Sequence, residues 1–121
     1  MITYERARLI QAGCTDLAQR IVHVAVVEGD SAGYDVCSFN VDGTERHIEV
    51  KTTGGPATNA FFISPNEVRH SRNHADTHVL MRVYGYATAT NSANYYEHVG
   101  FIDDAFGLTP SEYRAKLLPT G

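Results

Sequence analysis

The segment Ile48-Glu49-Val50-Lys51 constrains the fold of this chain more than any other. Ile and Val are β-branched residues that favour strands, and successive side chains of a strand point to opposite faces. Ile48 and Val50 therefore share one face, while Glu49 and Lys51 share the other. Removing the charges of an acid and a base from water beside a core costs several kcal/mol. Proteins usually keep such charges only where a metal ion or a partner charge compensates, or where catalysis uses them. The segment thus predicts a strand with one apolar face and one charged face.

A hairpin brings a second acid toward this charged face. Residues 34–40 and 46–53 are predicted to be strands, with a short turn between them. A two-residue turn would place Asp35 and Glu49 on opposite faces. A three-residue loop with Gly43 in the left-handed conformation places Asp35 directly opposite Glu49. We predict the three-residue loop, and with it a face that carries two acids and the lysine.

The rest of the chain alternates helical and strand patterns. Helices are predicted from about residue 4 to 12, over 16–20, and after two Ser/Thr-x-x-Glu capping boxes that open segments 64–73 and 109–118. Further strands are predicted over residues 21–27, 61–63, 77–86 and 95–102. This order predicts an α/β fold in which helices flank a central mixed sheet, as a single domain over residues 1–121.

Composition restricts the function classes. The 121 residues are 43% hydrophobic and 20% charged, which is typical of a soluble globular domain. The chain has no apolar run long enough to span a bilayer and no signal-peptide pattern. Cys14 and Cys37 are far apart and are expected to be reduced thiols, so we expect a cytoplasmic protein and no membrane partner. The net charge of −4 argues against tight, non-specific DNA binding by this domain alone.

Two acids and a lysine on one face are suited to hydrolysing a phosphodiester. Mg²⁺ takes hard oxygen ligands, commonly one or two carboxylates with water and substrate phosphate. Asp35 and Glu49 would be the ligands, with the carbonyl of Val50 as a third, and Lys51 would orient the attacking water or neutralise developing charge. The alternative is a cross-strand ion-pair ladder on a solvated face.

These residues resemble the PD-(D/E)xK nuclease superfamily, whose fold is restriction-endonuclease-like. More closely, the chain resembles the C-terminal domain of the plant protein NO VEIN, a domain that recurs in bacterial helicase-linked and defence-associated proteins. The resemblance covers about residues 5–117 and rests on Gly33-Tyr34-Asp35, Ile48-Glu49-Val50-Lys51-Thr52-Thr53, Phe62-Ile63-Ser64-Pro65-Asn66-Glu67 and Met81-Arg82-Val83-Tyr84. It implies that Asp35 and Glu49 bind Mg²⁺ and that Lys51 is the catalytic lysine. Tyr34 stands where the superfamily name has Pro.

Several other side chains are candidates for supporting roles. The resemblance implies an acid on the first helix, and Glu5 is the one available, although an acid in a first turn is also favoured by the helix dipole. Thr53 shares the charged face and would be placed to hold water or phosphate; an exposed strand Thr is the alternative. Asn66 is not needed for the helix cap and is a candidate substrate contact. The predicted helix also has a positive face, formed by Arg69, His70 and Arg72. This face would contact phosphates or, alternatively, lie in solvent.

Histidines spaced four apart suggest zinc. His70, His74 and His78 would form a stripe on one continuous helix. The helix is predicted to end before His78, however, and no cysteine is nearby in the sequence. We therefore do not expect structural zinc in this stripe.

We expect a metal-dependent endonuclease that hydrolyses phosphodiester bonds in DNA, with RNA as an open alternative, in restriction or anti-phage defence. The expected cofactor is Mg²⁺ or Mn²⁺. Target recognition would come from a partner protein or domain, and a homodimer would supply two sites for double-strand cleavage. The alternative is an inactive nuclease-fold module that binds nucleic acid or a protein partner. A third reading is a structural or inhibitory protein in which the charged trio is an ion-pair ladder.

Overall fold

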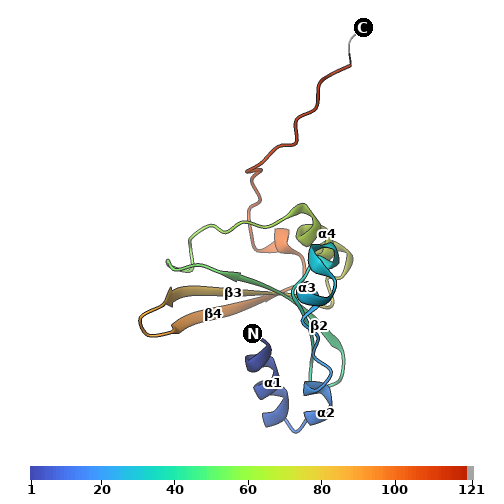
Figure 1. Ribbon diagram of the computed structural model, residues 1–121, viewed down its shortest axis with the longest axis vertical. Helices are drawn as coiled ribbons and strands as arrows, with labels where there is room; N and C mark the ends of the chain where they lie inside the picture. Colours follow the sequence, from blue (N-terminus) through green and yellow to red (C-terminus); the bar gives the residue numbers. More distant parts are fainter. Residues whose placement is uncertain (120–121) are drawn as a thin grey trace.

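The computed structural model describes residues 1–119, and for residue 30 the backbone alone. Its centre is a four-stranded sheet in the order β1-β2-β3-β4, drawn in Figure 1. The strands are β1 (Val36–Phe39), β2 (Glu45–Thr52), β3 (His78–Ala87) and β4 (Ser92–Val99). β2 and β3 are parallel, whereas the two outer pairs are antiparallel. The sheet is therefore mixed and flanked by helices, which confirms the predicted α/β fold.

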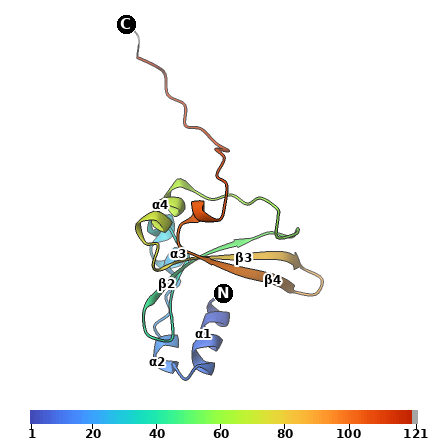
Figure 2. The same cartoon turned by 180° about the vertical axis from the view of Figure 1, so that it is seen from behind.

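Helices cover both faces of the sheet. α1 (Ile2–Gln11) and α2 (Thr15–Ala18) lie together near the amino terminus, and α3 (Val24–Val27) lies near α4 (Pro65–Asn73), as both views show (Figures 1 and 2). Two short 3-10 turns, η1 (Gly29–Ala32) and η2 (Ile102–Asp104), complete the fold. No helix within residues 1–119 is long and apolar enough to cross a membrane.

The apolar face of the sheet carries the larger core cluster. Val36, Ile48, Val79 and Met81 are buried there, and Met1 and Ile2 at the start of α1 pack against them. Burying each such side chain contributes about 1.5–3 kcal/mol. This packing fixes Ile48 inward, and the alternation of the strand then fixes Glu49 toward the opposite face.

The hairpin has the predicted three-residue loop. The N–H of Asn40 donates to the carbonyl of Thr44 at 2.8 Å, and Gly43 has φ +90°. β1 then pairs Val36 with Ile48, and the N–H of Asp35, the residue before β1, also donates to the carbonyl of Ile48, at 2.9 Å. The three-residue loop predicted from the sequence is confirmed, and Asp35 and Glu49 lie on the same side of the sheet, where they line one cavity.

The capping box before α4 is also confirmed. The Ser64 side chain accepts a hydrogen bond from the N–H of Glu67 at 3.1 Å, and Glu67 accepts one from the N–H of Ser64 at 2.8 Å. Pro65 occupies the first turn, and the helix ends at Asn73 as predicted. α4 is the crossover between the parallel strands β2 and β3, so this cap sets where the helix begins over the sheet.

Three predicted elements are wrong. Residues 21–27 were expected to be a buried strand, but only Val22 bridges β1, and the residues after it form α3, with Val26 and Val27 exposed. Residues 61–63 form no strand, and residues 109–118 form no helix. The capping box at 109–112 lacks a packing surface, because the apolar side chains after it are exposed and the segment extends away from the sheet (Figure 1). Short helices without tertiary packing are marginal in water.

Candidate active site

The charged face of the sheet lies beneath α4 and lines a polar cleft. Asp35, the residue before β1, and Glu49 of β2 line the same cleft, and Lys51 lies two residues beyond Glu49 on β2. Asp35, Glu49 and Glu67 all line a cavity of about 240 Å³, together with Tyr34 and Ser64. The segment just before β1 supplies Asp35, β2 supplies Glu49, and the capped start of α4 supplies Glu67.

Asp35 is held at the end of β1 by the backbone of β2. Its own N–H donates to the carbonyl of Ile48 at 2.9 Å, and its Oδ2 accepts from the N–H of Val50 at 2.9 Å. Because the N–H and C=O of a strand residue point to the same side, the carbonyl of Val50 also faces the Asp35 side. The three oxygen donors expected from the sequence thus lie around one end of the β1–β2 hairpin.

Lys51 is paired with two carboxylates in the cleft. Its Nζ lies 3.3 Å from Oε1 of Glu49 and 2.9 Å from Oε1 of Glu67. All three side chains are at least four-fifths buried. Although burial alone disfavours the charged ammonium, Glu67 and Glu49 raise the pKa of Lys51 above its ordinary value. Lys51 is therefore a fixed positive charge next to the acids.

Glu49 is the least satisfied group of the cleft. Its Oε2 is buried and has no hydrogen-bond partner among the residues that the structure describes. Burial, followed by the nearness of the Glu67 and Asp35 carboxylates, raises the pKa of Glu49 to about 9. Ionised carboxylates crowded in this way repel each other unless a cation lies between them. The available donors are the carboxylate oxygens of Asp35 and Glu49 and the carbonyl oxygen of Val50. Oxygen donors of this kind fit a hard divalent cation such as Mg²⁺.

Glu67 is a site residue that the sequence reasoning assigned to the helix cap alone. It serves both purposes, because its Oε1 accepts from the N–H of Ser64 and from Lys51 Nζ. Although burial raises the pKa of Glu67, its hydrogen bonds, with the positive charge of Lys51, hold it below its ordinary value. Glu67 therefore remains ionised and anchors the lysine.

Thr53 is placed beside a buried arginine and not in the cleft lining. Its hydroxyl accepts a hydrogen bond of 2.7 Å from Arg82, which is fully buried. Arg82 also donates to the carbonyls of Lys51 and Asn59 and lies over the ring of Phe61 at 4.9 Å. Arg82 thus fixes the end of β2 and the segment that follows it, a role that its own segment of the sequence did not reveal.

The other candidates are dispersed. Glu5 lies on the opposite side of the sheet, paired with Arg46 at 3.0 Å, so the structure does not bring it to the cleft. Asn66 donates to the carbonyl of Ser31 at 3.2 Å. Arg72 pairs with Asp103 at 2.7 Å on the surface, and Arg69 is exposed.

His70 is buried in a histidine cluster, which we define as His47, His70, His74 and His78. The His47 and His70 rings approach to 3.2 Å between Nδ1 and Nε2, and the His74 ring stacks on His70 at 4.5 Å. His78 is fully buried with both ring nitrogens unpartnered among residues 1–119. His70 is therefore inaccessible to phosphate, contrary to the positive helix face expected from the sequence.

The histidine cluster makes stability depend on pH. Burial, then the neighbouring histidines, lowers the pKa of both His70 and His78 to about 4. The unfolded chain binds these protons near pH 6.5, so the free energy of unfolding should fall as the pH drops from about 6.5 to 4. We expect a loss on the order of 3 kcal/mol for each of the two histidines, measured by urea unfolding with a chelator present.

The control for this pH dependence is His23, which is exposed. His78→Asn should flatten the curve between pH 6.5 and 4, whereas His23→Asn should leave it unchanged. A curve that is equally steep in wild type and His78→Asn would contradict the assignment.

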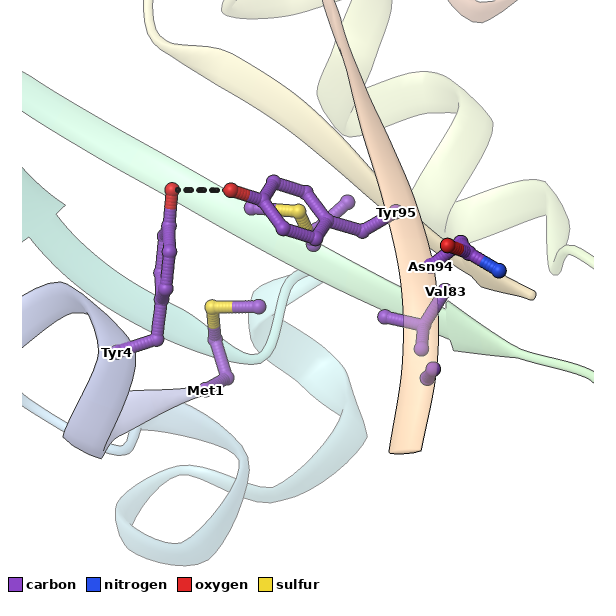
Figure 3. Close-up of a pocket in the computed structure, with 7 residues that line it drawn as sticks. Met1, Tyr4, Val83, Asn94 and Tyr95 are labelled. Carbon is purple, nitrogen blue, oxygen red and sulfur yellow. Dashed lines mark hydrogen bonds between the residues drawn. The ribbon is translucent and has the colours of Figure 1, made fainter. Parts of the chain in front are cut away.

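A second pocket is apolar. It has a volume of about 140 Å³ and lies between α1 and the β3–β4 hairpin, where Tyr4 and Tyr95 meet through their hydroxyls at 3.2 Å (Figure 3). Met1 and Val83 line it, and among its lining side chains only the tyrosines are titratable. It has none of the features of a hydrolytic site.

Comparison with known proteins identifies the family. Searches among curated proteins and solved structures returned no significant match. The family model described as the C-terminal domain of protein NO VEIN matches residues 1–96, a span that includes β1, β2, α4, β3 and most of β4. The matched span contains Asp35, Glu49, Lys51 and Glu67. The chain therefore belongs to the family of NO VEIN C-terminal domains.

Proposed function

We propose that this domain is a metal-dependent nuclease of the PD-(D/E)xK type that hydrolyses phosphodiester bonds in DNA. One observation carries the proposal: Asp35 and Glu49 line one polar cleft, Lys51 Nζ lies 3.3 Å from Glu49, and a buried oxygen of Glu49 has no partner within residues 1–119. A divalent ion, Mg²⁺ or Mn²⁺, would be held by Asp35, Glu49 and the carbonyl of Val50. When bound, it would polarise the phosphate and acidify a water.

The protein's own residues would do the rest. Asp35 is fixed by the backbone N–H of Val50, so its carboxylate needs no reorganisation to bind a ligand. Lys51, held by Glu67, would orient the water and stabilise the charge that develops on the phosphate oxygens. Binding of a cation would also remove the repulsion that keeps a proton on Glu49.

The biological setting is part of the proposal. A cytoplasmic role in restriction or anti-phage defence is consistent with the family resemblance. The acidic balance of the chain, −4, gives little attraction for DNA, so we infer that a partner protein or domain supplies target recognition. A homodimer would provide the second site needed to cut both strands.

The second candidate function is a catalytically inactive module of the same fold that binds nucleic acid or a protein partner. It is favoured by the pairing of Lys51 with both Glu49 and Glu67, which satisfies the lysine without a metal. The two functions differ in their need for a divalent ion. An inactive module should fold and bind equally well in a chelator.

The deciding experiment is a Mn²⁺-supplemented cleavage assay on supercoiled, linear and single-stranded DNA and on RNA. We expect Asp35→Asn, Glu49→Gln and Lys51→Ala each to reduce cleavage by about 10²-fold or more. The matched control is Glu112→Gln, an exposed acid of the carboxyl-terminal segment, which should retain wild-type cleavage.

Calorimetry with Mg²⁺ or Mn²⁺ provides the second readout. The two acid variants should lose metal binding, and Lys51→Ala should keep it. Cleavage that persists in all three variants would assign the activity to another protein. Metal-independent folding and binding with no cleavage on any substrate would favour the inactive module.

A further inference from the structure

A second set of metal-ligating side chains lies on the same face of the sheet, beyond the cleft toward the hairpin loop. Cys37 and His47 are direct cross-strand partners, and Glu45 lies two residues before His47 on β2. One ligand atom from each of these three residues lies within 4.8 Å of the other two. The hairpin register that joins Asp35 with Glu49 therefore joins this Cys37–Glu45–His47 cluster as well.

We propose that the Cys37–Glu45–His47 cluster is a second metal site, specific for a transition metal such as Zn²⁺. A thiolate, an imidazole and a carboxylate are the ligands that Zn²⁺ takes, whereas Mg²⁺ prefers oxygens alone. This chemistry separates the cluster from the oxygen-lined cleft. Tetrahedral ligands at 2.0–2.3 Å from zinc lie about 3.5 Å apart, so the widest gap must close by about 1 Å through side-chain rotation.

The imidazole of His47 is already oriented for a ligand. Its Nε2 faces Oε2 of Glu45 at 2.7 Å, and a cation there would take the place of the shared proton. Its Nδ1 lies 3.2 Å from Nε2 of His70 and can donate a hydrogen bond there when Nε2 of His47 takes a metal ion, as zinc-bound histidines do to their outer partners. The ring of Tyr34 stacks on His47 at 4.3 Å and 6°, which limits rotation of the imidazole.

Two features of exposure fit a zinc ion with an open fourth position. The His47 side chain is buried and Cys37 is half-buried, whereas the Glu45 side chain is 55% exposed. Water could therefore reach the metal from the Glu45 side. Zinc sites with three protein ligands commonly hold water as the fourth.

Co²⁺ is the probe, because it replaces Zn²⁺ and reports its ligands spectroscopically. Titration of the metal-free, reduced full chain should give one equivalent of tetrahedral Co²⁺ with a thiolate charge-transfer band, which Zn²⁺ should displace. Cys37→Ser should abolish the band, and Glu45→Gln should weaken Co²⁺ affinity at least about tenfold. The matched control is Cys14→Ser, which removes the other thiol and should leave the spectrum unchanged.

The test distinguishes this site from the nuclease cleft. Asp35→Asn should leave the Co²⁺ thiolate band intact, because that residue is not one of the three ligands. The proposal is overturned if the band survives Cys37→Ser, if it is lost equally in Cys14→Ser, or if no stoichiometric Co²⁺ or Zn²⁺ binding occurs. Circular dichroism of each variant separates loss of ligand from loss of fold. None of these outcomes depends on whether the domain cleaves DNA.

Discussion

Glu5→Ala is expected to lower the free energy of unfolding by about 3–5 kcal/mol. Glu5 is fully buried, and its carboxylate accepts hydrogen bonds from Arg46 Nε and Arg8 Nη2, each at 3.0 Å. Arg46 is itself buried and continues the network to Glu97 at 2.7 Å. Removing the central carboxylate leaves buried positive charge with one partner fewer, which is costlier than removing the whole network. Urea unfolding at pH 7 measures the effect.

The pH dependence gives an independent check on this network. Burial alone would raise the pKa of Glu5, but its bonds to Arg8 and Arg46 hold that pKa below the ordinary 4.5. The stabilisation is therefore complete above about pH 4.5 and is lost as the pH falls through the lower, folded-state value. The wild type should lose stability in that range, and Glu5→Gln, a milder variant that is expected to fold, should not show this component.

Metal affinity separates a structural Glu5 from an accessory ligand. Because Glu5 lies across the sheet from the cleft, the folded Glu5→Gln protein should bind Mg²⁺ or Mn²⁺ as tightly as the wild type. The exposed control Glu112→Ala should change stability by less than about 0.5 kcal/mol. Unchanged stability with weakened metal binding would reverse the assignment.

Local rules predicted the hairpin and the capped helix because the residues concerned act on their immediate neighbours. Gly43 permits a left-handed loop conformation, and that fixes the register of every pair behind it. The same register places Cys37 opposite His47, so the sequence already contained the signal for the Cys37–Glu45–His47 cluster. It was missed because cysteine and histidine ligands were sought close together along the chain instead of across the strands.

The errors arise where tertiary packing decides. Residues 21–27 are rich in β-branched side chains, yet β1 accepts one bridge from Val22, and the N–H of Ala25 then bonds to the carbonyl of Asp35. This turns the chain into α3 and leaves Val26 exposed at 74%. Strand propensity depends on a partner strand and a buried face, and a single sequence specifies neither. The sequence likewise left open whether Glu5 joins the site or is structural, since helix position alone does not tell which face of a sheet α1 covers.

Glu67→Gln is expected to reduce cleavage by about ten- to a hundredfold, provided that the domain is the nuclease we propose. The charge on Glu67 holds Lys51 Nζ at 2.9 Å, and a neutral amide would release the lysine toward Glu49. Gln preserves the shape of the side chain and can still accept from the N–H of Ser64, so the helix cap should persist. The loss should therefore appear in catalysis with little change in urea stability.

Ser64→Ala is the matched control for the dual role of Glu67. It removes the hydroxyl that accepts from the N–H of Glu67 and should cost about 1 kcal/mol of stability, because one amino-terminal donor of α4 loses its side-chain partner. The carboxylate of Glu67 stays beside Lys51, so cleavage measured well below the unfolding temperature should remain near wild type. If both variants lost activity in proportion to their loss of stability, Glu67 would act only as a cap. If the capping box also positions the lysine, Glu67→Gln should lose cleavage and keep its stability, whereas Ser64→Ala should lose stability and keep cleavage.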